Sequence, residues 1–133
     1  HRVCAGLRGL PVPVIAQVSG YCLGAGLEVA ASCDLRVSAE HSQFGMPEVS
    51  LGLLPGATGV TKMTRHLGLL GAQPFLVEGK LFGPREALEL GLVHELVSDP
   101  SQLRDKASAS SPARRGCGNI PNDGKIATTT RFA

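Results

Sequence analysis

A glycine-rich turn and two glutamates are the residues of this sequence whose types and spacing best suit chemistry. The turn holds Gly24, Ala25 and Gly26, between an apolar β-branched segment and the start of a helical pattern. The first N–H groups of a helix have no partner within it, so such a turn can bind negative charge. Small residues also let a ligand approach the main chain, so the N–H of Ala25 or Gly26 could stabilise an oxygen that becomes negative during a reaction. The alternative is a turn that needs glycine for its geometry alone.

The first acid, Glu28, lies in the first turn of the predicted helix. A carboxylate there complements the helix dipole by ~0.3–1 kcal/mol, which is the ordinary explanation for an acid at this position. Its neighbours Leu27 and Val29 are apolar, however, and they indicate that Glu28 is partly buried. A positioned acid shielded from bulk water is suited to acid–base catalysis.

The second acid, Glu48, follows Pro47 in the segment FGMPEVSLG, which contains no Lys or Arg. Taken alone, it would be a loop glutamate that faces water. Taken with Glu28, it completes a pair of acids whose segments could converge on one pocket. Two carboxyl groups can hold one water between them, one taking its proton while the other gives a proton to a neighbouring carbon.

Other polar residues are weaker candidates. We expect Ser19 to have no paired base, and the histidines lack the spacing of metal ligands, so neither a nucleophilic serine nor a metal site is predicted. Lys62 and Arg65 could contact an anionic ligand, although solvation of a helix face is the simpler explanation. The histidines, which we expect at the surface or at helix ends, are His1, His41, His66 and His94.

The elements around the glycine turn follow a parallel α/β pattern. Residues 12–18 (VPVIAQV) predict a strand that is buried on both faces, as in a parallel sheet. A short helix over 26–34 and a second strand over 35–39 should follow. Residues 42–59 contain four glycines and two prolines and predict packed loop and turn.

The second half of the pattern is more helical. Residues 60–79 predict two short helices divided near residues 68–71. Pro84 and Gly91 bound a further helix, and a strand should follow within VHELV, residues 93–97. From residue 108 onward, small and polar residues replace the periodic apolar pattern, which is typical of irregular or disordered chain.

The composition is that of one globular domain. The chain has 133 residues, of which 43% are hydrophobic and 18% charged, with a formal net charge of +2. No apolar run approaches the roughly 20 residues that span a membrane, and no basic patch with interleaved aromatics suggests nucleic acid. The four cysteines show no pattern of disulfides or zinc ligands. We therefore expect a soluble protein with free thiols in a reducing compartment, the cytoplasm or else the mitochondrion.

Residues 11–99 resemble the enoyl-CoA hydratase/isomerase, or crotonase, superfamily. The resemblance lies in PVIAQVSGYCLGAGLEVAASCDLRVSAEHSQFGMPEVSLGLLPGATG and continues through HLGLLGAQPFLVEGKLFGPREALELGLVHELV. It implies an α/β fold with a crotonase-like core, a spiral of repeated ββα and βαβ units. We expect a core over residues 1–107, incomplete on its N-terminal side, and an irregular tail over 108–133.

The resemblance also assigns roles to residues. Ala25 matches the position whose backbone N–H lines the oxyanion hole of the family, where glycine is usual. Glu28 and Glu48 match the two hydratase glutamates, and Gly56 matches a glycine near the substrate. Gly24 and Gly26 flank the oxyanion position.

Having both acids favours a hydratase, a lyase of fatty acid metabolism that adds water across a trans-2-enoyl-CoA double bond. The alternatives are an enoyl-CoA delta-isomerase, another acyl-CoA lyase, or a non-catalytic domain that uses the fold for binding or assembly. The expected partner is an acyl-CoA thioester as substrate, and no cofactor or metal is implied.

The length of the chain adds two expectations. Family members are roughly twice as long, and their N-terminal half carries the other oxyanion amide, so we expect little or no hydratase activity from these 133 residues alone. Family members also form trimers or hexamers through helices that have no counterpart after residue 108, so we do not expect the same homo-oligomer of this chain.

Overall fold

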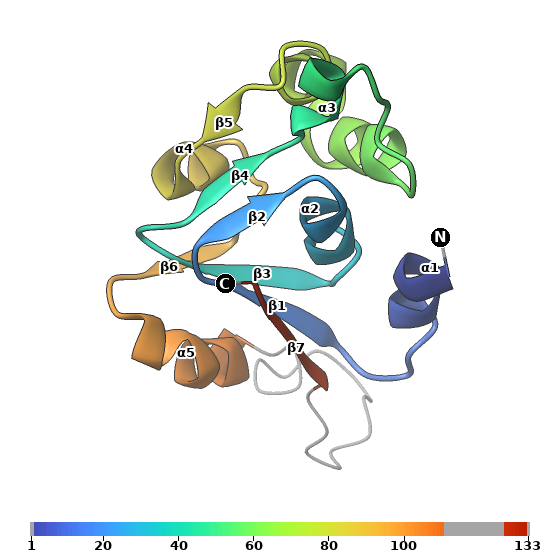
Figure 1. Cartoon of the computed structure of the whole chain (residues 1–133). Coiled ribbons are helices and arrows are strands. Elements are labelled where there is room, and N and C mark those ends of the chain that lie inside the picture. Colours follow the sequence, from blue (N-terminus) through green and yellow to red (C-terminus); the bar gives the residue numbers. More distant parts are fainter. Residues whose placement is uncertain (1, 111–126, 133) are drawn as a thin grey trace.

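A computed structural model of the chain describes residues 2–110 and 127–132, which form two small sheets and the helices around them (Figure 1). In the larger sheet all three pairings are parallel, in the order β6–β3–β1–β7. Its strands are β1 (Val14–Val18), β3 (Leu35–Ala39), β6 (Glu95–Val97) and β7 (Ala127–Phe132). The smaller sheet contains β2 (Tyr21–Leu23), β4 (Gln43–Gly45) and β5 (Leu81–Phe82). In it β4 pairs in parallel with β2 and antiparallel with β5.

The helices lie on both sides of the larger sheet. Helix α5 covers one face, and α2 with the smaller sheet covers the other, with α3 beyond them (Figure 1). The α-helices are α1 (Arg2–Arg8), α2 (Ala25–Ala30), α3 (Gly59–Leu76), α4 (Pro84–Glu89) and α5 (Leu103–Ser110). Two 3-10 helices, η1 (Pro47–Leu51) and η2 (Pro100–Gln102), complete the set. None of these helices combines the length and the apolar character needed to span a membrane.

Strand β1 is buried on both faces, as its sequence predicted. Val14, Ala16 and Val18 enter the main core, whereas Ile15 enters a second core beneath α5. Successive side chains of a strand point to opposite faces, so a strand between two cores must be apolar almost throughout.

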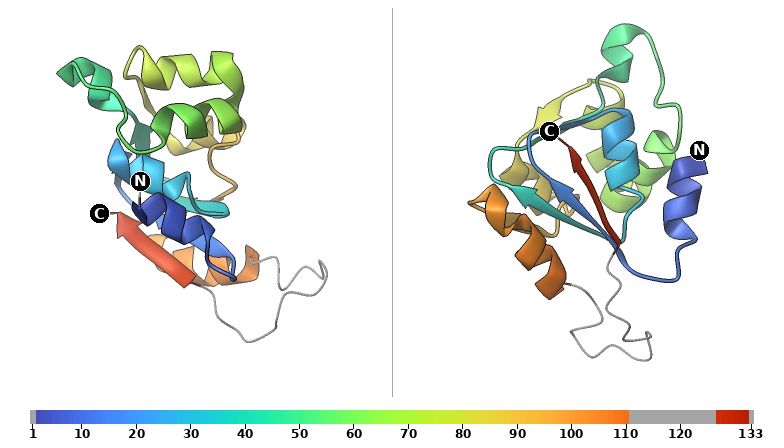
Figure 2. Two further views of the ribbon diagram at one scale, coloured as in Figure 1. Left: turned by 90° about the vertical axis from the view of Figure 1, so that its right-hand side faces the viewer. Right: turned by 60° about the horizontal axis from the view of Figure 1, so that its bottom comes forward.

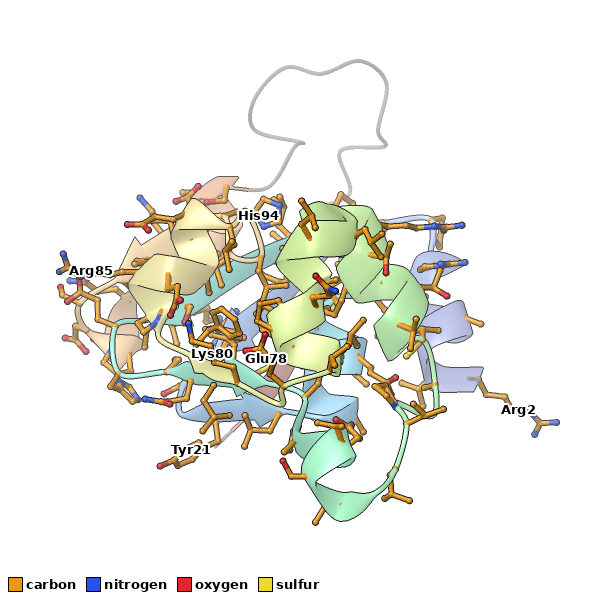
Figure 3. All side chains as sticks on the ribbon, turned by 90° about the horizontal axis from the view of Figure 1, so that it is seen from above. Arg2, Tyr21, Glu78, Lys80, Arg85 and His94 are labelled. Atoms are coloured by element: carbon orange, nitrogen blue, oxygen red, sulfur yellow. The ribbon has the colours of Figure 1, made fainter. Side chains whose placement is uncertain are left out.

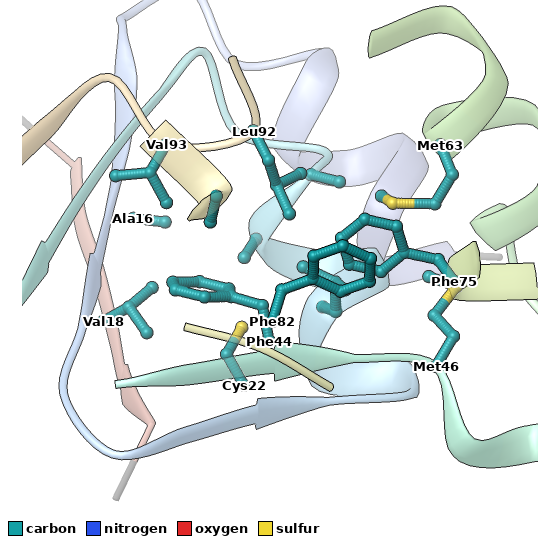
Figure 4. Packing of buried hydrophobic residues seen from close by; sticks show 14 of the residues in the cluster. Ala16, Val18, Cys22, Phe44, Met46, Met63, Phe75, Phe82, Leu92 and Val93 are labelled. Atoms are coloured by element: carbon teal, nitrogen blue, oxygen red, sulfur yellow. The ribbon is translucent and has the colours of Figure 1, made fainter. Parts of the chain in front are cut away.

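The main core joins the larger sheet, the smaller sheet and the helices α2, α3 and α4. The rings of Phe75 and Phe82 stack with their centroids 3.9 Å apart. Figure 4 shows these rings close to Phe44 and between Met46 and Leu92. Packing of this kind connects strands β4 and β5 to α3, so the position of the segment that follows β4 depends on α3.

Arg36 is a buried cation in this structure, 1% exposed. Its Nε donates to the carbonyl of Leu92 at 2.6 Å, and one terminal nitrogen donates to the carbonyls of Cys33 and Ala30 at 2.9 and 3.4 Å. A cation at the C-terminal end of a helix complements the helix dipole. Arg36 therefore ties the end of α2 to the loop before β6.

Most predicted elements are confirmed. The strand over 35–39 is β3, and the predicted helices are α2 and α4, with Gly91 in a left-handed conformation (φ 75°) just after α4. The division of residues 60–79 is also confirmed, because α3 is interrupted at Gly68 (φ 70°, ψ 174°). The sequence patterns did not predict α1 or the short strand β2, which lies between β1 and the glycine turn. Residues 42–59, predicted as packed loop and turn, include β4 and η1, and Leu53 and Leu54 are exposed rather than packed.

The C-terminal segment differs from the expected irregular tail at both of its ends. Residues 108–110 form the last turn of α5, and residues 127–132 form β7. Strand β7 pairs in parallel with β1 and covers the edge that β1 would otherwise leave open (Figure 2). A β-branched run, Thr128 to Thr130, suits that strand. The expectation for residues 111–126 lies outside the described residues.

Two ion pairs of the described residues lie at the surface, while a third, between Lys106 and Glu95 at 3.1 Å, is partly buried on the Glu95 side. Lys80 contacts Glu86 at 2.9 Å, and Arg85 contacts Glu40 at 3.2 Å, with side chains that are at least 43% exposed. Figure 3 shows Lys80 and Arg85 on the same side of the molecule. Exposed pairs of this type contribute about 0–1 kcal/mol each, so apolar packing dominates the stability of the fold.

Candidate active site

The glycine turn begins helix α2. Gly24 is the N-cap residue, with φ 51° and ψ −124°, a conformation open to glycine and rarely to other residues. Its N–H donates to the carbonyl of Gly45 at 2.9 Å, which ties the turn to strand β4. Ala25 is exposed, and because it is the first residue of α2 its N–H has no acceptor within the helix. Gly26 follows in the same turn and is half-buried.

Glu28 is almost completely buried, with 2% of its surface exposed. Its carboxylate accepts hydrogen bonds from three successive backbone N–H groups at the start of α3. Oε1 lies 3.1 Å from the nitrogen of Ala57, 2.9 Å from that of Thr58 and 2.6 Å from that of Gly59. Oε2 lies 3.2 Å from the nitrogen of Ala57. The prediction that Glu28 is partly buried is therefore confirmed, and burial is nearly complete.

These bonds replace a local helix cap. Thr58 occupies the N-cap position of α3, yet its side chain makes no capping hydrogen bond, and its Oγ1 is buried without a partner among the described residues. The orphan N–H groups of the first turn are instead satisfied by Glu28, which comes from another helix. The dipole of α3 also favours the negative charge.

Glu48 lies in η1, directly after Pro47, and is half-buried. Its carboxylate packs against the glycine turn, because a Cβ added at Gly24 would lie 2.8 Å from Oε1 of Glu48. Its Oε2 is buried and has no hydrogen-bond partner in the described part of the chain. A buried polar atom without a partner costs about 1–3 kcal/mol, so this oxygen is available to a ligand.

The structure thus brings both acids to the first turn of α2. Glu48 contacts its N-cap, Gly24, and Glu28 lies four residues further along the same helix. Gly56 precedes the amide of Ala57 but is itself exposed, with nothing within 4 Å of an added Cβ. Its predicted role near the substrate stays a prediction.

Sequence patterns did not point to three residues of the site, Ala57, Thr58 and Gly59, whose N–H groups donate to Glu28. The signal that could have found them is the helix start itself, since Thr-Gly before an apolar run is typical of an N-terminus with orphan N–H groups. The acceptor, however, is about 30 positions away in the sequence, and no local rule could have identified it.

Of the weaker candidate residues, Arg65 lies where it was expected, whereas Ser19 and Lys62 do not. Ser19 Oγ lies 3.2 Å from Nε2 of His41, so the expectation that Ser19 has no paired base is wrong in three dimensions. The contact is exposed and joins the end of β1 to the turn after β3. Arg65 is exposed as expected, but Lys62 is 8% exposed rather than on a solvated face. Burial lowers the pKa of Lys62, and the nearby Arg8 lowers it further.

His66 and His94 act as local hydrogen-bonding groups. His66 Nε2 lies 3.1 Å from the carbonyl of Ala31, and His94 Nδ1 accepts from the N–H of Arg36 at 3.1 Å. Burial lowers the pKa of both imidazoles. Within the described residues, no group of three or more His, Cys, Asp or Glu side chains is arranged to hold a metal ion.

The described cysteines are free thiols, and all three are buried: Cys4, Cys22 and Cys33. Burial raises the pKa of Cys22 to about 12 and that of Cys33 to about 11. A thiol acts as a nucleophile only as the thiolate, so these two groups are inert at neutral pH. Free cysteines were expected, and for these three residues the expectation is confirmed.

Comparison with known proteins identifies the family. The family model of enoyl-CoA hydratase/isomerase matches residues 3–114. The chain belongs to the enoyl-CoA hydratase/isomerase family. It is 44% identical over 99 residues to the fatty acid oxidation complex subunit alpha of Shewanella frigidimarina (strain NCIMB 400), covering 73% of this chain and 14% of that protein.

Solved structures of the enoyl-CoA hydratase/isomerase family have the same fold as this chain. An enoyl-CoA hydratase from Bacillus anthracis superposes with a TM-score of 0.75 at 36% identity, over 78% of this chain and 40% of that one. An enoyl-CoA hydratase/isomerase from Cupriavidus metallidurans CH34 superposes with a TM-score of 0.78 at 28% identity, over 84% of this chain and 42% of that one. The crotonase-like α/β core is thereby confirmed. The chain spans less than half the length of these relatives.

Proposed function

We propose that this chain carries the acid–base half of an enoyl-CoA hydratase, a lyase that adds water across the double bond of a trans-2-enoyl-CoA. The observation that supports this most directly is the arrangement at the first turn of α2. One buried carboxylate is held by three N–H donors, and a second has a buried oxygen without a partner. Ala25, an exposed residue at the start of the same helix, has an N–H without an acceptor within that helix.

The proposed role of Ala25 is to stabilise charge on the thioester oxygen. As water attacks the β-carbon, electron density moves to that oxygen, and a backbone N–H aimed at it binds the developing negative charge more strongly than the ground state. One such donor is worth ~2.7–4 kcal/mol. Alanine serves as well as glycine here, because the donor belongs to the main chain.

The two glutamates divide the proton transfers. We assign the proton of the attacking water to Glu28, which matches one of the two hydratase glutamates and whose carboxylate is fixed in direction by three backbone N–H donors. The hydroxyl group bonds to the β-carbon. Glu48 gives a proton to the α-carbon on the same face. The proton that Glu28 took from the water then passes to Glu48 and restores its protonated form. One water is added overall, and the reaction needs no cofactor or metal.

The test is hydration of crotonyl-CoA, measured on the 133-residue chain and on a chimera in which these residues replace the matching 40% of the B. anthracis enzyme. We expect the chimera to hydrate crotonyl-CoA and the short chain to show little or no activity. Glu48→Gln in the chimera should lower kcat by about 10²–10⁴-fold and leave the Kd for an acyl-CoA near that of the parent chimera.

Two results would change the assignment. A folded chimera that shifts the double bond of a 3-enoyl-CoA but does not hydrate a 2-enoyl-CoA is an isomerase. A folded chimera with neither activity and no affinity for CoA thioesters supports a non-catalytic role for the fold. Discrete trimers or hexamers in either sample would extend the proposal to assembly.

A further inference from the structure

The N-terminal end of α3 lies against the carboxylate of Glu28 and donates hydrogen bonds to it. The shortest contact is the hydrogen bond from the N–H of Gly59 to Oε1, at 2.6 Å. Gly59 is itself buried and is the first residue of the helix. Its contact with Glu28 joins α3 to α2 at the residue that the proposed hydration uses.

Gly59 has no room for a side chain. A Cβ built there would lie 2.5 Å from Cβ of Pro55, 2.8 Å from Oε1 of Glu28 and 2.9 Å from Cε of Met46. Real Cβ atoms do not come this close to other heavy atoms. The methyl group of Met46 can move aside, but the ring of Pro55 is rigid, so either the helix start or the carboxylate has to move.

Backbone conformation does not explain this glycine. Gly24, at the other end of the site, has a positive φ of 51°, which by itself favours glycine. Gly59 has no positive φ, so alanine could adopt its backbone conformation. Alanine is also the better helix former. Space beside the carboxylate is the remaining reason for a glycine at this position.

We propose that Gly59 is a positioning residue for Glu28. The absent side chain lets the N-terminal turn of α3 come within hydrogen-bond distance of the carboxylate and fixes the direction of its oxygens. The catalytic relevance of this inference rests on the proposed role of Glu28 in hydration. The contact itself does not depend on that role and can be tested without any activity.

A purely structural role predicts something different. If Gly59 only relieves crowding against Pro55 and Met46, replacing it should affect the fold equally whether or not Glu28 carries a carboxylate. If Gly59 acts through Glu28, replacing both residues should be little worse than replacing one, because the shared contact is lost only once.

The experiment is an NMR and unfolding study of the 133-residue chain as Gly59→Ala, Glu28→Gln and the double variant. The control is Gly6→Ala, which changes another helical glycine, one with nothing within 4 Å of an added Cβ. In Gly59→Ala we expect hydrogen exchange at the amides of Ala57 and Thr58 to be at least about tenfold faster, since their acceptor moves away. The control should leave both amides unchanged.

In the double variant, hydrogen exchange at these two amides should be no more than about twofold faster than in Glu28→Gln alone. Where the same substitutions are placed in a hydrating chimera, Gly59→Ala should lower kcat and leave KM nearly unchanged. Additive effects, or amides of Ala57 and Thr58 that stay as in the parent chain, would overturn the proposal. If Gly59→Ala does not fold, Glu28→Gln decides alone, because unchanged shifts of the amides at 57–59 in that variant would show that the contact is absent.

Discussion

The two acids of the site lie in parts of the molecule with opposite packing. Glu28 belongs to α2, in which the neighbouring Leu27 is fully buried. The carboxylate of Glu28 accepts hydrogen bonds from N–H groups at the start of α3. Glu48 belongs to η1, in which no residue is buried. Beyond η1 the exposed apolar residues continue, with Leu53 at 59% and Leu54 at 81% exposure.

This difference concerns how each acid is held. An acid that must stay in one orientation needs its hydrogen bonds completed by the fold, and Glu28 meets that condition. Glu48 is held differently, because its Oε2 has no hydrogen-bond partner among the described residues and can take one from a ligand or water. The fold thus contains one acid that is fully hydrogen-bonded by backbone N–H groups and one acid with a buried oxygen that has no partner among the described residues.

Truncating one leucine in α2 and one after η1 should give the largest difference in stability between the two regions. Leu27→Ala should lower the free energy of unfolding by about 2–5 kcal/mol, because it leaves a cavity in the main core. Leu54→Ala should change it by less than about 0.5 kcal/mol, since the side chain is mostly in water. Urea unfolding monitored by circular dichroism measures both. Equal losses would mean that the segment after η1 is packed as tightly as α2.

Removing the charge from each acid tests the same contrast at the site. Glu28→Gln should lower the free energy of unfolding by about 1–3 kcal/mol, because the side-chain NH2 group faces backbone N–H donors and cannot accept from them. Glu48→Gln should have a smaller effect, since its Oε2 has no partner to lose. Matched urea titrations of the two variants check this. A larger loss of unfolding free energy for Glu48→Gln would mean that Glu48, and not Glu28, is the acid whose hydrogen bonds stabilise the fold.

The buried thiols predict an effect that is absent at neutral pH and grows above pH 9. Burial raises the pKa of Cys22 to about 12 from an ordinary value of 9.0, so the folded state holds this proton more tightly than the unfolded chain. The stabilisation is complete below pH 9 and is lost as the pH rises toward 12, by about 1.4 kcal/mol per pH unit. Cys33, whose pKa is raised to about 11, contributes in the same way, so Cys22→Ala should remove about half of the slope measured by unfolding at pH 8, 9 and 10. An unchanged slope in that variant would mean that Cys22 does not contribute to it.

Local patterns were enough to predict much of the fold. The apolar run of β1 required burial on both faces, and Pro84 with Gly91 bounded α4 correctly. Strand β2 was missed because three residues are too few for a periodic signal. Strand β7 was missed because its pairing partner, β1, is more than 100 positions away.

By itself, the sequence was enough to single out two acids as candidates for chemistry. Glu28 and Glu48 were identifiable because an acid among apolar residues, without a nearby cation, is unusual. Only the tertiary structure decided how each acid is held, because hydrogen bonds join atoms that are close in space, whatever their separation along the chain. The amides of residues 57–59 reach Glu28 because α3 packs against α2, and the missing side chain of Gly59 leaves room for that contact.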